Sequence, residues 1–111
     1  MAYDHTLAHR TRAALLAHAP APASEKKMFG GLAFMVNGNM TMGVLGEQLI
    51  VRVGLEKYEY ALSRPGADLF QTTGKPMAGW VTVAPQGYET DEDLRAWTAL
   101  ALDFVNTLPA K

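Results

Sequence analysis

The dipeptide Asn37-Gly38, set between two apolar runs, constrains the fold of this chain more than any other feature. The first run extends from Lys27 to Val36, and the second extends from Asn39 to Leu45. A type I′ turn needs positive φ at both central positions, and Asn-Gly adopts these angles readily. The two runs are therefore predicted to form an antiparallel β-hairpin.

A second tight turn extends this hairpin into a three-stranded meander. Gly46-Glu47 follows the second run and leads into a third, Gln48–Val53, which ends at Gly54. Strands joined by tight turns must pair antiparallel. This pattern excludes the parallel sheet of nucleotide-binding folds.

Three stretches are predicted to be helical. Asp4 is a favourable N-cap for a helix from His5 to Ala19, which the prolines that follow would end. A short helix is expected over Leu55–Ser63. Thr90 and the acidic residues after it favour the start of a last helix, whose apolar side chains recur with helical spacing: Leu94, Trp97, Thr98, Ala101, Phe104, Val105 and Leu108.

Two further strands are expected, over Leu69–Thr72 and Gly79–Ala84. The chain is then one domain, residues 1–111, in the order α-β-β-β-α-β-β-α. We predict the α+β class, with an antiparallel sheet of about five strands and helices packed on it.

The composition argues against most kinds of catalytic and metal-binding site. Cysteine is absent, and His5 and His9 have helical metal-pair spacing but no obvious third ligand. Ser24 and Ser63 are not in a nucleophile-elbow motif. The only clustered carboxylates, Asp91–Asp93, are explained by helix capping. We therefore expect no catalytic residue, metal or cofactor.

Charge and hydropathy limit the partners and the cellular location that can be expected for this chain. Ten basic residues stand against eleven acidic ones, so the chain provides no overall field for a polyanion, and direct nucleic-acid binding is not expected. No apolar run approaches the roughly 18 residues of a membrane span, and the N-terminus lacks a signal-peptide profile. The expected location is the cytoplasm, away from membranes.

The run Met28-Phe29-Gly30-Gly31 is the first candidate binding segment. A glycine pair permits a β-bulge, a close crossing by the first helix, or backbone approach to a ligand. These glycines lead into a strand rather than a helix, which disfavours a phosphate cradle.

Arg52, Lys75 and Trp80 are the other candidate binding residues. Arg52 interrupts an apolar strand, so it either pairs with a carboxylate, lies exposed at an edge, or forms the wall of a polar pocket. Lys75 and Trp80 flank a turn that contains a proline. This arrangement occurs in ordinary turns, and it would also suit a site for a small anion or a peptide.

The expected meander is apolar on both faces. Phe29, Ala33 and Met35 oppose three apolar residues of the same strand, and the next strands repeat the pattern, with Met40, Met42 and Val44 assigned to one face. Either helices cover both faces or another molecule covers one, for which methionines are well suited: Met28, Met35, Met40 and Met42. We favour a homodimer.

Several motifs, in order, resemble the TfoX N-terminal domain family, also called Sxy, in its stand-alone form. They are the opening Met1-Ala2-Tyr3-Asp4, the run from Lys27 to Gly38, Leu49-Ile50-Val51-Arg52-Val53-Gly54, the stretch Gly74–Val81 and the close Phe104–Pro109. The similarity extends over nearly the whole chain.

This resemblance implies a fold similar to that of secretion chaperones and no known enzymatic activity. Longer members carry a C-terminal helical domain and regulate competence genes together with a DNA-bound activator. The chain is thus expected to be a non-catalytic protein-interaction or regulatory module, with a partner such as a transcription regulator. The alternative is a small-ligand-binding or enzymatic domain around Arg52, Lys75 and Trp80.

Overall fold

A computed structural model of the chain describes residues 3–18, 23–28, 30–72 and 74–110. It confirms the α+β class and the antiparallel sheet. The elements follow the order α1 (His5–His18), β1 (Ser24–Met28), β2 (Gly31–Val36), β3 (Asn39–Leu45), β4 (Gln48–Arg52), α2 (Tyr58–Leu62), β5 (Ala67–Thr72), β6 (Lys75–Val83), the short 3₁₀ helix η1 (Pro85–Gly87) and α3 (Asp91–Val105).

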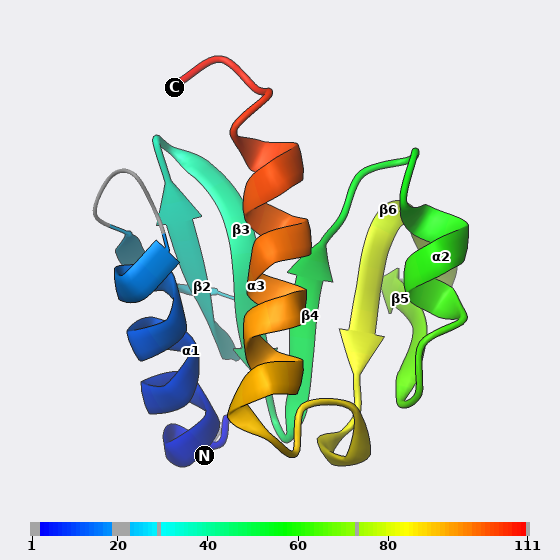
Figure 1. Ribbon diagram of the computed structural model, residues 1–111, viewed down its shortest axis with the longest axis horizontal. Coiled ribbons are helices and arrows are strands. Elements are labelled where there is room, and N and C mark those ends of the chain that lie inside the picture. The colour runs from blue at the N-terminus through cyan, green and yellow to red at the C-terminus, as the bar shows by residue number, and fades with distance from the viewer. Residues whose placement is uncertain (1–2, 19–22, 29, 73, 111) are drawn as a thin grey trace.

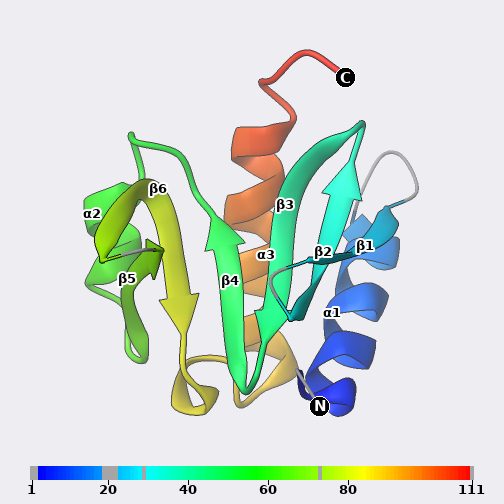
Figure 2. The ribbon, with the colours of Figure 1, turned by 180° about the vertical axis from the view of Figure 1, so that it is seen from behind.

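The six strands form one sheet in the order β1-β2-β3-β4-β6-β5 (Figures 1 and 2). Every neighbouring pair is antiparallel. The last strand in the chain, β6, lies between β4 and β5, where Arg52 pairs with Trp80. The sheet therefore has one strand more than the sequence predicts.

The extra strand corrects the prediction of a single strand from Lys27 to Val36. This stretch contains the end of β1 and all of β2, and Gly30 stands between the two strands with φ +77°. The glycine pair is therefore at a turn, and the bulge interpretation is wrong. Gly31 does allow a close approach of two backbone segments, because a Cβ atom on it would collide with the Val44 carbonyl oxygen of β3. The segment that comes close is therefore β3 and not the first helix. Phe29 lies outside the described residues.

The two turns of the predicted meander are confirmed. Asn37 and Gly38 have φ values of 53° and 80°, and Val36 pairs with Asn39 across the turn, as expected of type I′ geometry. Leu45 pairs with Gln48 around the second turn, where Gly46 has φ +60°.

A register shift between β2 and β3 changes which methionines share a face. Phe34 pairs with Met42, but Met35 pairs with Met40, so Thr41 is the extra residue. The assignment of Met40 to the face of Met42 is therefore wrong. Met42 is fully buried in the core, whereas Cε of Met40 lies over Gly43 on the opposite face.

All three α-helices pack on one face of the sheet, as Figures 1 and 2 show from opposite sides. Helix α3 packs on β3 and β4, α1 packs on α3 and β3, and α2 packs on β5 and β6. The core between the layers includes Leu7, Phe34, Val51, Val81 and Trp97. The idea that helices cover both faces is therefore wrong for the described residues, and the uncovered side is called the open face below.

The predicted starts of α1 and α3 are confirmed. The Asp4 carboxylate accepts hydrogen bonds from the amides of Thr6 (2.8 Å) and Leu7 (3.1 Å), and Thr90 Oγ1 accepts one from the Asp93 amide (3.0 Å). Helix α2 is shorter than predicted and begins only at Tyr58. None of the described helices has the length and hydropathy needed to cross a bilayer.

Candidate functional site

The centre of the open face is buried although no helix covers it. Ala33 and Ile50 are 0% and 5% exposed, and Ile50 lies on this side because its neighbours Leu49 and Val51 point into the core. Side chains from both edge strands, Met28 of β1 and Phe70 of β5, line a single hollow over them. The sheet is therefore curved toward its open face.

We call this depression the methionine hollow, and its volume is about 530 Å³. Its lining is almost wholly apolar: Met28, Gly31, Leu32, Ala33, Met40, Val44, Leu45, Ile50, Phe70, Gln71, Met77 and Trp80. Among the described lining residues none is charged. The hollow can therefore bind an apolar group by excluding water.

Two lysines border the methionine hollow. Lys26 precedes Met28 by two residues on β1, and Lys75 precedes Met77 by two residues on β6, so each lysine shares the strand face of a lining methionine. Both lysines are exposed. Lys26 and Lys75 therefore add two positive charges to the open face around an uncharged floor, and Asp68, which pairs with Thr82 on the same face, adds one negative charge.

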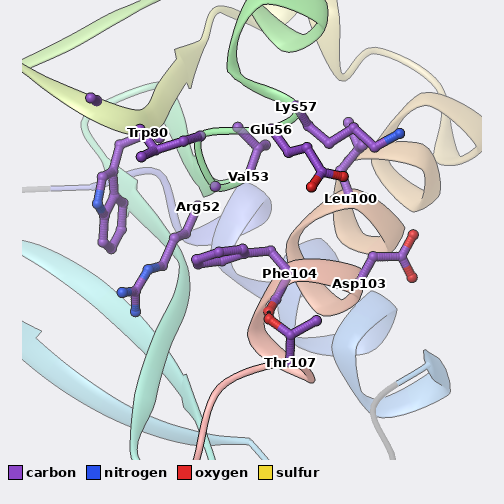
Figure 3. A pocket seen from close by; sticks show the side chains of 13 residues that line it. Arg52, Val53, Glu56, Lys57, Trp80, Leu100, Asp103, Phe104 and Thr107 are labelled. Atoms are coloured by element: carbon purple, nitrogen blue, oxygen red, sulfur yellow. Dashed lines mark hydrogen bonds between the residues drawn. The ribbon is translucent and has the colours of Figure 1, made fainter.

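Trp80 separates this hollow from a second one. Its ring lies 6.2 Å from the Phe70 ring, centroid to centroid, and it lines both depressions. The second, the Arg52 pocket, has a volume of about 620 Å³ and lies between β4, β6, the loop after β4 and the end of α3 (Figure 3). Its lining is Arg52, Val53, Gly54, Leu55, Glu56, Lys57, Ala78, Gly79, Trp80, Leu100, Asp103, Phe104 and Thr107.

Arg52 extends between two aromatic rings in this pocket (Figure 3). The guanidinium carbon lies 5.1 Å from the Trp80 ring centre and 5.3 Å from that of Phe104. Nη1 donates a hydrogen bond to the Met40 carbonyl oxygen at 3.3 Å. Burial lowers the pKa of Arg52, but an arginine remains charged.

A carboxylate partner, one of the interpretations open for Arg52, is not found in the described part of the chain. The ion pairs there join Arg10 to Asp91 and Arg12 to Glu25. Of the interpretations open for Arg52, the structure therefore matches the wall of a polar pocket.

The candidate residues from the sequence fall into two groups. Met28, Gly31 and Trp80 meet at the methionine hollow, whereas Arg52 meets Trp80 at the neighbouring pocket. Lys75 lines neither cavity and does not converge with Arg52, which corrects the three-residue site considered above. Gly30 is an exposed turn residue, and Phe29 lies outside the described residues.

Sequence reasoning missed Phe70, Ile50 and Phe104 as lining residues. Phe104 follows the core spacing of the last helix, and only its half-buried position at the helix end distinguishes it. Leu69 pairs with the core residue Val81, so strand alternation places the next residue, Phe70, on the open face.

Neither cavity contains a histidine, serine or cysteine among its described lining residues. The methionine hollow provides apolar contact area, and the Arg52 pocket provides one partly buried cation. Both arrangements are suited to binding.

Comparison with known proteins identifies a family. A search of the curated proteins finds no match. The family model described as the TfoX N-terminal domain matches residues 14–105, which include every strand, all of α2 and α3 and the C-terminal end of α1. The chain therefore belongs to the TfoX N-terminal domain family.

Proposed function

We propose that this chain is a non-catalytic protein-interaction module whose methionine hollow binds an apolar, acidic-flanked segment of a partner protein. The observation that carries the proposal is the meeting of Met28 and Gly31 with Met77 and Trp80, from distant parts of the chain, in one uncovered apolar hollow. An apolar depression on an otherwise polar surface is typical of interaction sites.

Methionine makes this surface adaptable. Met28, Met40 and Met77 come from three different strands, and their unbranched side chains can repack around ligands of different shape. The hollow therefore suits a partner segment that presents several large apolar side chains, such as one face of an amphipathic helix.

The lysines beside the hollow favour a partner segment with negative charge. Lys26 and Lys75 stand beside the hollow, and its described lining provides no carboxylate to neutralise them. Acidic residues flanking the apolar segment would gain favourable contacts there, and basic residues would be repelled.

A second copy of the chain, the homodimer expected from the sequence, is the competing occupant. Two concave faces that meet across a twofold axis touch at their rims and leave both hollows unfilled. The curvature therefore favours a narrow segment over a second sheet.

A regulatory role agrees with this proposal. Family membership points to a regulatory module related to competence and transcription regulators, and such a module can act by holding a transcription regulator through its hollow. The near-balanced charge of the chain supports protein contact rather than direct binding of nucleic acid.

The experiment uses two designed helical peptides of about 14 residues with leucine at positions i, i+3, i+4 and i+7. One carries glutamate at the remaining positions and the other carries lysine. Calorimetry on the full chain should show the glutamate peptide binding at least about tenfold more tightly, and added salt should reduce the difference. Resonances of the lining methionine methyl groups should shift.

The matched variants reverse the rim charge. Lys26→Glu combined with Lys75→Glu should reverse the peptide preference. Lys27→Glu should leave it unchanged, because Lys27 pairs with Leu32 and lies on the helix-covered side. Binding of neither peptide, or an equal effect of Lys27→Glu, contradicts the proposal. So does a dimer in light scattering that Met77→Glu dissociates, since the second copy would then be the occupant.

A further inference from the structure

The Arg52 pocket contains an unused binding group. Arg52 is half-buried, its Nη1 is engaged by the Met40 carbonyl, and no carboxylate of the described residues lies within 4.0 Å of it. A guanidinium has five N–H donors in a planar fork. The described contacts therefore leave donors of Arg52 available to a ligand.

The two neighbouring rings restrict how a ligand can approach Arg52. Trp80 and Phe104 lie on either side of its side chain (Figure 3), with ring centres 5.1 and 5.3 Å from the guanidinium carbon. With rings on two sides of the side chain, a ligand reaches the guanidinium through the N–H edge that they leave uncovered. A planar carboxylate matches such an edge with two parallel hydrogen bonds.

The two backbone donors that follow Arg52 in the chain are already occupied. The amides of Val53 and Gly54 both donate to the Gly79 carbonyl, at 2.8 and 3.0 Å. These amides cannot form an anion-binding nest for a phosphate. Arg52 is thus the main anchor that the inner pocket offers to an anion.

The outer lining selects against highly charged ligands. Lys57 is outnumbered there by Glu56 and Asp103, and all three side chains are exposed. Two carboxylates near the opening would repel a phosphate ester or a nucleotide. Leu55 and Leu100 add apolar wall that suits an uncharged body.

We infer that the Arg52 pocket binds a small organic monocarboxylate, its carboxylate on the Arg52 edge and its flat apolar body beside Phe104 and Trp80. This site is distinct from the methionine hollow, with which it shares only Trp80 among the described lining residues. Its test is therefore independent of the proposed protein-binding function.

Phenylacetate is the probe, with neutral phenylacetamide and inorganic phosphate as comparisons. Titration into the ¹⁵N-labelled chain should shift the Arg52 Nε–H and Trp80 indole N–H resonances, with a dissociation constant on the order of 1 mM. Phenylacetamide and phosphate should bind at least about tenfold more weakly. No shift at tens of millimolar phenylacetate, or equal binding of phenylacetamide or phosphate, would overturn the inference.

Variants of Arg52 distinguish recognition of the carboxylate by the guanidinium fork from simple attraction between opposite charges. Arg52→Lys keeps the charge but loses the fork, and Arg52→Gln loses both, so each should weaken phenylacetate binding at least about tenfold. Arg64→Gln is the matched control, because Arg64 also lies over an aromatic ring, that of Tyr60 at 5.9 Å, and is outside the pocket lining. If Arg52→Gln unfolds, the folded Arg52→Lys variant decides the question. Undiminished binding by Arg52→Lys, or an equal loss in Arg64→Gln, refutes the inference.

Discussion

The ring of Phe104 on α3 packs directly against Gly54, in the loop that follows β4. A Cβ atom built on Gly54 would lie 2.7 Å from Cε1 of that ring, and Gly54 has φ +82°. Both steric space and backbone conformation therefore require glycine here. The contact also holds Phe104 beside Arg52, so it supports the wall of the Arg52 pocket.

Gly54→Ala should destabilise the protein by about 2–4 kcal/mol, since overpacking and left-handed backbone strain act together. Chemical denaturation followed by circular dichroism measures the loss.

Gly46→Ala is the matched control for this change. Gly46 also has positive φ, +60°, but a Cβ atom there meets nothing within 4 Å. It should cost only the backbone strain, about 1 kcal/mol. Equal losses in the two variants would mean that the Phe104 contact is unimportant.

Tyr88→Phe should lower the free energy of unfolding by about 1 kcal/mol at neutral pH. The Tyr88 hydroxyl donates a 2.6 Å hydrogen bond to the Glu47 carbonyl, and burial raises the pKa of this hydroxyl. A raised pKa means that the folded state favours the protonated form. The wild-type chain should therefore lose stability as pH rises above the unfolded pKa of about 10.

The pH dependence distinguishes this effect from simple packing. The stability difference between the wild-type chain and Tyr88→Phe should shrink above pH ~10 in urea denaturation series. A difference that stays constant from pH 7 to beyond this range would contradict the assignment.

Glu25→Gln should reduce stability by only about 0.5 kcal/mol at pH 7. Glu25 on β1 pairs with Arg12 on α1, and this hydrogen bond lowers the pKa of the Glu25 carboxyl. The side chains of Arg12 and Glu25 are 48% and 32% exposed, so water screens the pair.

A lowered pKa also sets the pH range of this contribution. It is present above the unfolded glutamate pKa of about 4.3 and is lost as pH falls through the lower folded value. The stabilities of wild type and Glu25→Gln should therefore converge in acid. A gap that widens below pH ~4 would show that the ion pair is not its source.

The elements predicted well from sequence are those defined by local chemistry. Asn37-Gly38 has the φ angles of its turn type, and Asp4 and Thr90 cap their helices as their side-chain oxygens allow. These features depend on residues close together in the chain. Local steric and hydrogen-bonding rules are sufficient to predict them.

The errors in the sequence-based predictions arise where tertiary packing determines the local structure. The turn at Gly30 divides one apolar run into β1 and β2, and the extra residue Thr41 moves Met40 to the open face. Neither event changes composition or periodicity enough to be recognised. For the same reason, the sequence suggested the importance of Arg52 and Trp80 but not the enclosing ring of Phe104.

The position of β6 divides the fold into two parts that can unfold separately. Among the described strands of the meander, β4 alone pairs with β6, while α3 packs on β3 and β4 and α2 packs on β5 and β6. The helical layer thus divides along the same line as the sheet. We expect native-state hydrogen exchange to reveal two cooperative units, with the amides of α2, β5 and β6 exchanging together and before those of β3.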